Sequence, residues 1–260
     1  MSAAGKGFRL DGAEIPFRDG QGVLEAALDA GRYIPHLCFE PGLPPHDSCR
    51  LCTVMVGGRA AAACSLPAAE GLDVVSDSPE LGDARRQLLQ LLFSEGNHIC
   101  PGCERSGDCK LQASAYAAGM QDNHFPQLFP VRERDASHPD VLLDRDRCIL
   151  CELCVRGSRL LDGKDVFAIA RRGIASQLVV NSPSGLLGDS ALAVTDHAVR
   201  LCPVGALLPK RPAALVPLGE YGQRASSALM SAAKANGASV VAMESYDRSN
   251  ASLAAAARKT

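Results

Sequence analysis

The chain has 260 residues, among them 11 cysteines and 6 histidines, with no tryptophan and a formal net charge of −2. This length allows one large domain or two to three small ones. The near-neutral charge and the 4% aromatic content offer neither a basic surface nor stacking rings, so we exclude nucleic acid as a partner. An odd cysteine count argues against a fully paired disulfide framework.

The composition also bears on the compartment. Residues 1–17 lack the apolar core of a signal peptide, and no stretch reaches the roughly 18 uninterrupted apolar residues of a membrane span. We therefore expect a cytoplasmic protein without a membrane span. In such a reducing setting, cysteines are mostly free, catalytic or metal-bound.

Residues 1–78 are predicted to form a small α+β domain. Residues 7–19 predict two short strands around a tight turn, and residues 22–31 predict a short amphipathic helix. Further along, Gly57-Gly58 predicts a hairpin, and one more strand follows it. Strands around one helix, with a cysteine-bearing loop between them, indicate a β-grasp ferredoxin-like domain.

Residues 79–140 are predicted to form a helical domain. Ser78 suits the N-cap of a helix that has Pro79 at its first position and acidic residues in its first turn. A second helix is predicted over residues 109–120. Residues 122–139 are rich in proline and predict a loop.

Two further segments complete the chain. Residues 141–212 carry the last four cysteines and predict a bacterial-ferredoxin-like domain. Residues 213–260 are rich in alanine and serine, contain no cysteine, and predict a short β-α-β-α tail. The tail resembles a fragment of a type I periplasmic-binding-like domain. Because so short a fragment cannot bury a proper core, we expect a fusion remnant or a mobile appendage without a site.

The first ligand set follows the spacing C-x10-C-x2-C-x11-C and comprises Cys38, Cys49, Cys52 and Cys64. Plant-type ferredoxins bind a 2Fe-2S cluster with C-x4-C-x2-C and a distant fourth cysteine. This sequence keeps the C-x2-C step and has a longer first gap. A structural zinc site is the alternative, since four cysteines with a C-x2-C step also suit zinc. The preceding strand and helix favour the 2Fe-2S interpretation.

The third ligand set lies in RCILCELC and the later LCPVG, and comprises Cys148, Cys151, Cys154 and Cys202. C-x2-C-x2-C with a remote Cys-Pro is the bacterial ferredoxin arrangement for a 4Fe-4S cluster. In a two-cluster ferredoxin a fourth cysteine would stand where this chain has Ser158, so we predict one cluster here. Zinc is the weaker alternative, because a tetrahedral site gains nothing from C-x2-C-x2-C.

The second ligand set is the most ambiguous one, and comprises His98, Cys100, Cys103 and Cys109. Three thiolates and one imidazole form an ordinary structural zinc site. Between two predicted iron–sulfur sites, however, a 4Fe-4S cluster is the better interpretation. Eleven cysteines plus His98 make three complete sets of four. His124 is the nearest alternative to His98, and His138 is less favoured.

The stretch GNHICPGCERSGDCKLQ at residues 96–112, with LLFSEG leading into it, resembles the diaphorase gamma (iron–sulfur) subunit of soluble NAD-reducing nickel–iron hydrogenases. That protein is similar to the N-terminal part of the large iron–sulfur subunit of complex I. The resemblance covers residues 7 to about 212 and includes all three ligand sets. Complex I proteins usually space the histidine as H-x3-C, whereas H-x-C here favours the hydrogenase branch.

The resemblance implies one 2Fe-2S cluster and two 4Fe-4S clusters in series. It implies as partners an FMN- and NAD-binding flavoprotein subunit and the hydrogenase small and large subunits. The chain has no G-x-G-x-x-G between a strand and a helix and no nickel-site constellation, so we expect no substrate catalysis on this chain alone.

The predicted function is electron relay between a hydrogenase module and an NAD(H)/FMN flavoprotein. Two alternatives stay open. The first is the equivalent relay subunit of an NAD-dependent formate dehydrogenase or of complex I. The second is a structural zinc-binding scaffold protein.

Overall fold

The structure, a computed structural model, describes residues 6–210, 213–217, 223–224, 226–228, 230–231 and 242–246. It is a mixed α/β protein that divides into two compact units, Met1–Leu208 and Pro209–Thr260. All three ligand sets lie in the first unit.

The first unit begins with a five-stranded sheet in the order β2-β1-β5-β3-β4. Its strands are β1 (Gly7–Leu10), β2 (Ala13–Pro16), β3 (Thr53–Val56), β4 (Arg59–Ala62) and β5 (Asp73–Val75). Strands β1 and β5 are parallel, and the other described pairs are antiparallel. The turn residues of both hairpins, Asp11-Gly12 and Gly57-Gly58, have positive φ, which matches the right-handed strand twist. Both predicted hairpins are confirmed.

Helix α1 (Val23–Asp29) provides the apolar cover of this sheet. Its Leu24 packs in one buried cluster with Phe8, Ile15 and Val54 from three different strands. The side chains of these four residues are at most 2% exposed. Each strand turns alternate residues into this core. The loop between α1 and β3 lies at the border of the core.

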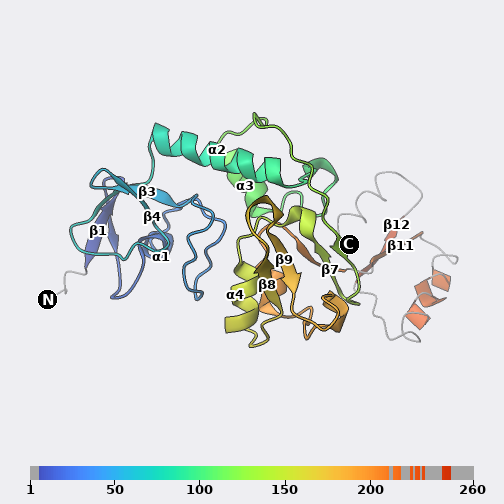
Figure 1. The fold of residues 1–260 in the computed structure, drawn as a ribbon. Helices are drawn as coiled ribbons and strands as arrows, with labels where there is room; N and C mark the ends of the chain where they lie inside the picture. Colours follow the sequence, from blue (N-terminus) through green and yellow to red (C-terminus); the bar gives the residue numbers. More distant parts are fainter. Residues whose placement is uncertain are drawn as a thin grey trace. The chain divides into compact units, whose positions relative to one another are not determined.

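Two helices form the next part of the unit. Helix α2 (Pro79–Glu95) begins as predicted, with the Ser78 Oγ accepting a hydrogen bond from the Leu81 N–H at 3.3 Å. Helix α3 (Lys110–Ala117) follows the short 3₁₀ turn η1 (Cys100–Gly102), and packs beside α2 through a shared buried cluster (Figure 1). The predicted proline-rich loop is largely confirmed, except that it contains the two-residue strand β6 (Arg134–Asp135).

The last part of the unit combines small sheets and helices. Strand β7 (Val141–Asp144) lies between β6 and β10 (Leu207–Pro209), and β8 (Phe167–Ala170) forms an antiparallel hairpin with β9 (Gln177–Val180). Helices α4 (Leu153–Leu160) and α5 (His197–Arg200) contact each other. The short turns η2 (Arg145–Arg147), η3 (Gly173–Ala175) and η4 (Leu187–Asp189) link these elements.

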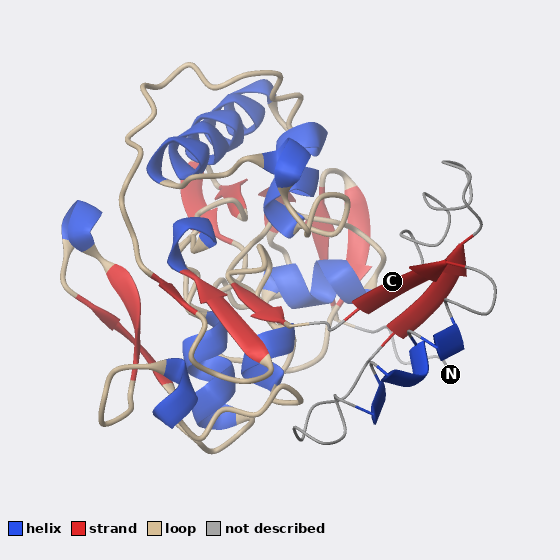
Figure 2. Cartoon of the chain, turned by 90° about the vertical axis from the view of Figure 1, so that its right-hand side faces the viewer, coloured by secondary structure: helices blue, strands red, loops and turns tan. Residues whose placement is uncertain are grey.

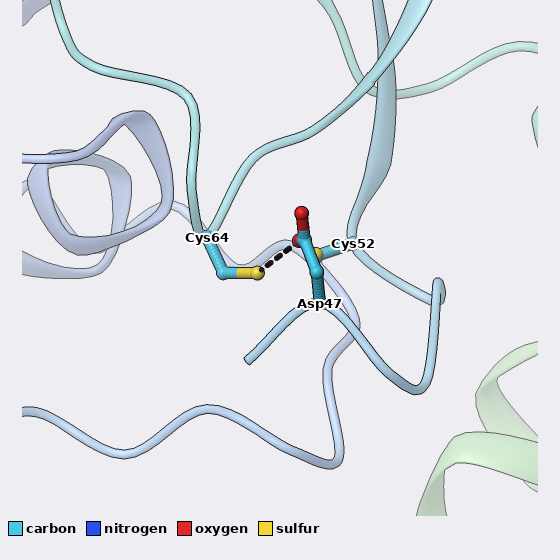
Figure 3. Close-up of side chains that lie close together, drawn as sticks. All are labelled: Asp47, Cys52 and Cys64. Carbon is cyan, nitrogen blue, oxygen red and sulfur yellow. Dashed lines mark hydrogen bonds between the residues drawn. The ribbon is translucent and has the colours of Figure 1, made fainter. Parts of the chain in front are cut away.

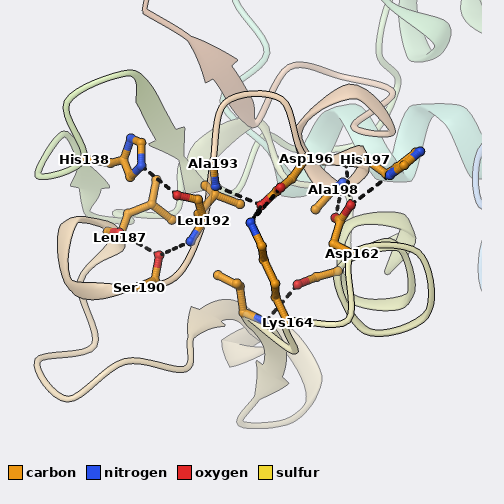
Figure 4. A network of polar contacts seen from close by, with 12 residues as sticks. His138, Asp162, Lys164, Leu187, Ser190, Leu192, Ala193, Asp196, His197 and Ala198 are labelled. Carbon is orange, nitrogen blue, oxygen red and sulfur yellow. Dashed lines mark hydrogen bonds and ion pairs between the residues drawn. The ribbon is translucent and has the colours of Figure 1, made fainter.

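A polar network ties the loop after α4 to the loop before α5 (Figure 4). The Asp162 carboxylate accepts hydrogen bonds from the N–H groups of His197 and Ala198 at the start of α5, at 2.9 and 3.0 Å. Nearby, the Lys164 ammonium lies 2.8 Å from both carboxylate oxygens of Asp196. These contacts position α5, and with it the cysteine that follows the helix.

The second unit contains a β-α-β arrangement. Strands β11 (Ala213–Pro217) and β12 (Ala242–Tyr246) pair in parallel, with helical residues described between them (Figure 2). The first three elements of the predicted tail are thus confirmed, and its last helix lies outside the described residues. Across the described part of the chain, no helix is both long and apolar enough to span a bilayer.

Candidate metal centres

The first ligand set gathers at the border of the five-stranded sheet. Cys38 and Cys49 belong to the long loop after α1, Cys52 directly precedes β3, and Cys64 follows β4. Cys38 lies beside Cys49, and Cys52 beside Cys64, because within each pair the two thiols shift each other's pKa. The structure therefore brings all four predicted residues together from four points of the chain.

The charges of these sulfurs are unevenly shared. The Cys49 thiol donates to Cys38, which lowers the pKa of Cys38 to about 5 and raises the pKa of Cys49. The neighbouring Cys64 lowers the pKa of Cys52, whereas Cys52, burial and Asp47 raise the pKa of Cys64. Within each pair one pKa is thus lowered and the other raised, and a bound metal centre would favour the thiolate form of all four sulfurs.

Asp47 is a further residue of this site that the sequence reasoning missed (Figure 3). Its Oδ1 accepts a hydrogen bond from the Cys64 Sγ at 3.0 Å, and its Oδ2 accepts one from the Ser65 hydroxyl at 2.7 Å. The ligand atoms of Asp47, Cys52 and Cys64 lie within 4.8 Å of one another. A single acidic residue in a loop carries no spacing signal, so nothing in the sequence singled it out.

The second ligand set lines one cavity of about 190 Å³, into which all four predicted residues turn. His98 comes shortly after the C-terminal end of α2, Cys100 opens η1, Cys103 caps η1, and Cys109 is the N-cap residue of α3. Burial raises the pKa of the Cys100 thiol and of the Cys109 thiol. Three sulfurs and one imidazole from three elements therefore meet around a space that a metal centre could occupy.

The His98 imidazole is prepared to act as a neutral ligand. Burial, followed by the nearby charges of Arg132 and Arg147, lowers the pKa of His98 to about 4, so the ring is neutral near pH 7. Its Nε2 is buried and has no hydrogen-bond partner among the described residues. The ring packs edge-on against Phe93, with 5.3 Å between the ring centroids. A buried nitrogen without a partner requires an explanation, and a metal bond is one.

The two alternative histidines lie elsewhere. His124 is largely exposed, with 70% of its side chain accessible, and its Nε2 lies 3.3 Å from the Asp122 carboxylate. His138 is buried, but its Nε2 lies 3.0 Å from the Leu192 carbonyl oxygen and its Nδ1 accepts main-chain N–H groups. Neither ring lines the cavity of the second set, so the geometry favours His98.

The third ligand set lines a second, apolar cavity, to which all four predicted cysteines contribute. Leu150 and Glu152, two of the four residues between the first three cysteines, have positive φ, so the loop curls around this space. The Ala206 N–H donates to the Cys202 Sγ at 3.1 Å. Burial raises the pKa of Cys148 to about 11, and raises the pKa of the other buried thiols of this loop further.

The residue at the missing fourth position of a second cluster has a structural role. Ser158 is fully buried in α4, and its Oγ accepts a hydrogen bond from the Val166 N–H at 2.8 Å. This hydrogen bond ties α4 to the segment before β8, and four cysteines line the cavity of the third set.

The three sets are linked by packing. Cys151 shares a buried cluster with Cys38 and Cys49, whereas Cys148 and Cys109 belong to a neighbouring cluster. The Arg156 Nη2 donates to the Cys38 carbonyl oxygen at 2.6 Å and to the Cys151 carbonyl oxygen at 3.4 Å. One guanidinium thus joins the main chain of the first and third sets.

Family models match three segments of the chain. Residues 7–79 match a 2Fe-2S iron–sulfur cluster binding domain, residues 85–124 match the NADH-ubiquinone oxidoreductase-G iron–sulfur binding region, and residues 141–208 match a 4Fe-4S single cluster domain. Fold and site together therefore define an iron–sulfur protein with 2Fe-2S and 4Fe-4S binding domains.

Comparison with individual proteins identifies the family within this class of iron–sulfur proteins. The gamma subunit of the NAD-reducing hydrogenase HoxS from Cupriavidus necator is 39% identical over 211 residues, which are 81% of this chain and 89% of that protein. A crystal structure of NAD+-reducing NiFe-hydrogenase in the H2-reduced state contains a chain with 60% identity and a TM-score of 0.77, over 80% of this chain and 88% of that one. The chain belongs to the family of gamma subunits of NAD-reducing hydrogenases.

Relatives from other complexes share only their ligand-bearing part. The G subunit of the NADH-quinone oxidoreductase from Streptomyces coelicolor is 34% identical over 203 residues. The alpha subunit of the NADPH-Fe(3+) oxidoreductase from Geobacter sulfurreducens is 29% identical over 203 residues. The chain spans 24% of the length of each of these two proteins.

Proposed function

We propose that this chain relays electrons between a hydrogenase module and an NAD(H)/FMN flavoprotein, as the electron-transfer subunit of an NAD-reducing hydrogenase. The observation that carries the proposal is the convergence of three complete ligand sets inside one compact unit. The family to which the chain belongs supports the choice of partners, namely the flavoprotein subunit and the hydrogenase small and large subunits.

The proposed cofactors are one 2Fe-2S cluster and two 4Fe-4S clusters. We assign the 2Fe-2S cluster to the first set, and one 4Fe-4S cluster each to the second and third sets. When bound, such clusters accept and release single electrons. The chain's own residues hold them in place, exclude water and tune their potentials through burial and hydrogen bonds to sulfur.

The packing of the ligand sets supports an order for the relay. The third set shares apolar neighbours with the first through Cys151, and a further cluster contains Cys49, Cys109 and Cys148, one cysteine from each set. The Arg156 guanidinium bridges Cys38 and Cys151, and the Lys110 N–H donates to the Pro203 carbonyl oxygen at 2.9 Å, beside the third set. We therefore place the third cluster between the other two.

Four segments correspond to this assignment. We propose a β-grasp ferredoxin-like domain over residues 1–78, a helical His/Cys cluster domain over 79–140, a bacterial-ferredoxin-like domain over 141–212, and a tail without a site over 213–260. The matched segments 7–79, 85–124 and 141–208 support the first three. The reducing conditions that eleven unpaired cysteines require support a cytoplasmic location.

Metal analysis of the anaerobically purified chain, separated from its partners, tests the proposal. We expect about ten irons in this chain and negligible zinc, because clusters of two, four and four irons are assigned. Cys52→Ser, Cys103→Ser and Cys151→Ser should each remove one cluster, with losses of about two, four and four irons. Stoichiometric zinc with fewer than about four irons would instead identify a zinc-binding scaffold.

A second measurement addresses the partners. The purified complex should reduce NAD+ with H2, and the absorbance of this chain's clusters should bleach when H2 is supplied alone. Bleaching with formate but not with H2 would assign the chain to a formate dehydrogenase instead.

A further inference from the structure

The cavity of the second ligand set is lined by three arginines, of which Arg105 and Arg147 each have a buried nitrogen without a hydrogen-bond partner among the described residues. Arg105 lies between Cys103 and Cys109, and Arg147 is the last residue of η2, directly before Cys148. The cavity of the third set contrasts with it, since Glu152 is its one charged residue among the described lining residues. Cationic groups are thus concentrated around the second set.

Both arginines are held by carboxylates that do not use all of their N–H groups. The Nε of Arg147 lies 3.1 Å from the Asp144 carboxylate, and its Nη2 lies 2.6 Å from that of Glu104. The Nη1 of Arg105 lies 2.8 Å from the Asp108 carboxylate. These ion pairs fix the two side chains and leave the Arg147 Nη1 and the Arg105 Nε unused.

These unused nitrogens are buried. Within the described part of the chain, five buried side-chain nitrogen or oxygen atoms lack a hydrogen-bond partner, and three of them belong to residues that line this cavity: His98 Nε2, Arg105 Nε and Arg147 Nη1. Leaving a buried guanidinium N–H without an acceptor is costly. An arginine only donates, so the missing partner of each N–H is an acceptor.

We propose that the Arg147 Nη1 and the Arg105 Nε donate hydrogen bonds to sulfur atoms of the cluster in the second set, and that they thereby raise its reduction potential. This inference rests on the proposed function. The acceptors are thiolate or inorganic sulfide sulfurs, which match the donor character of the two arginines. The His98 Nε2, the third of these atoms, is the proposed metal ligand.

The sign follows from charge. Reduction adds one electron to the cluster, and a cationic N–H donor stabilises the added negative charge. The proton stays on the guanidinium, which keeps its charge at every accessible pH, so electron uptake here needs no proton. A neutral imidazole in place of a thiolate acts in the same direction.

Redox titration of the purified complex, followed by electron paramagnetic resonance, tests the inference. In Arg147→Gln we expect the ratio of reduced to oxidised second cluster at a fixed poise to fall at least tenfold, which is about 59 mV for one electron. Arg105→Gln should shift it in the same direction. Arg147→Lys keeps the positive charge but lacks the planar guanidinium group, so we expect a smaller shift of the potential with the same sign.

Arg134→Gln is the matched control. Arg134 also lines the cavity and also contacts Asp144, at 3.2 Å, but its side chain is 64% exposed. We expect this variant to shift the second cluster by less than a third of the Arg147→Gln shift. Three outcomes would each overturn the inference. The first is an equal shift in Arg147→Gln and Arg134→Gln, and the second is a potential in Arg147→Lys identical to that of the unmodified protein. The third is a larger shift of the third cluster than of the second.

A direct readout is pulsed electron paramagnetic resonance on protein labelled with 15N-arginine. We expect a nitrogen coupling to the reduced second cluster that weakens in Arg147→Gln and persists in Arg134→Gln. Absence of the coupling from the unmodified protein would refute the hydrogen bonds. Absence of the cluster itself from the unmodified protein would instead refute the proposed function, so the two failures are distinguishable.

Discussion

Arg85 connects helix α2 to the main chain around the first ligand set. It is buried, with 9% of the residue exposed, and each of its three nitrogens has a different acceptor. The Nε donates to the Leu51 carbonyl oxygen at 3.0 Å, the Nη2 to that of Thr53 at 2.9 Å, and the Nη1 to that of Ser76 at 2.8 Å. Leu51 and Thr53 flank a ligand of this set. We therefore predict that Arg85 stabilises both the sheet–helix connection and the 2Fe-2S site.

The expected loss of stability on removing the Arg85 guanidinium follows from these contacts. Arg85→Met keeps much of the side-chain volume and removes three charge-assisted hydrogen bonds, each worth about 1.5–3 kcal/mol. The variant also avoids the desolvation of a buried guanidinium, which offsets several kcal/mol of that loss. We expect the free energy of unfolding to fall by about 3 kcal/mol. For a unit of this size, the melting temperature should fall by about 6–12 °C.

Arg86→Met is the matched control for the same helix. The Arg86 side chain is 41% exposed, donates to the Ala118 carbonyl oxygen at 3.1 Å, and lies 2.7 Å from the Asp83 carboxylate. Because an exposed ion pair contributes little, we expect a loss of at most about 1 kcal/mol.

Differential scanning fluorimetry of the anaerobic protein measures both melting temperatures. Hydrogen exchange followed by mass spectrometry locates the change, which we expect at residues 50–54 and 76–86 in Arg85→Met alone. The 2Fe-2S signal of this variant should also be lost at a lower temperature than the 4Fe-4S signals. Equal melting temperatures in the two variants would refute the reasoning.

Three further predictions concern single residues. His98→Ala should lose the second cluster alone. His98→Cys should keep the iron of this cluster and lower its midpoint potential, because a thiolate adds negative charge. Redox titration followed by electron paramagnetic resonance separates these outcomes. Gly96→Ala would place a methyl group against the His98 Nε2, so iron analysis should show a selective loss of about four irons. The pKa of Asp162 lies below its usual value. Burial raises this pKa, but hydrogen bonds from the N–H groups of Ala198 and His197 and from the His197 ring lower it by more. The stability that this carboxylate contributes is present above about pH 4 and is lost as the pH falls below it, so Asp162→Asn should flatten the melting temperature between about pH 5 and pH 3.

Much of the local structure was determined by the sequence alone. The turn dipeptides Asp11-Gly12 and Gly57-Gly58 accept positive φ, and Ser78 followed by Pro79 suits only the start of a helix. These signals act over a few residues, so they could be interpreted without the fold. The cysteine spacings belong to the same kind of signal, since C-x2-C steps follow from the short reach of one loop.

Other features depended on the tertiary structure, because they arise from residues far apart in the chain. Strand β6 was predicted as loop, since its two residues form a strand only by pairing with β7. The count of ligands already favoured His98 over His124, and the tertiary structure adds the burial of its ring and the cavity around it, which spacing does not convey. The carboxylate of Asp47 beside Cys64 required the fold to join two loops. Burial and the pairing of polar atoms are properties of the packed chain, so only the tertiary structure could decide them.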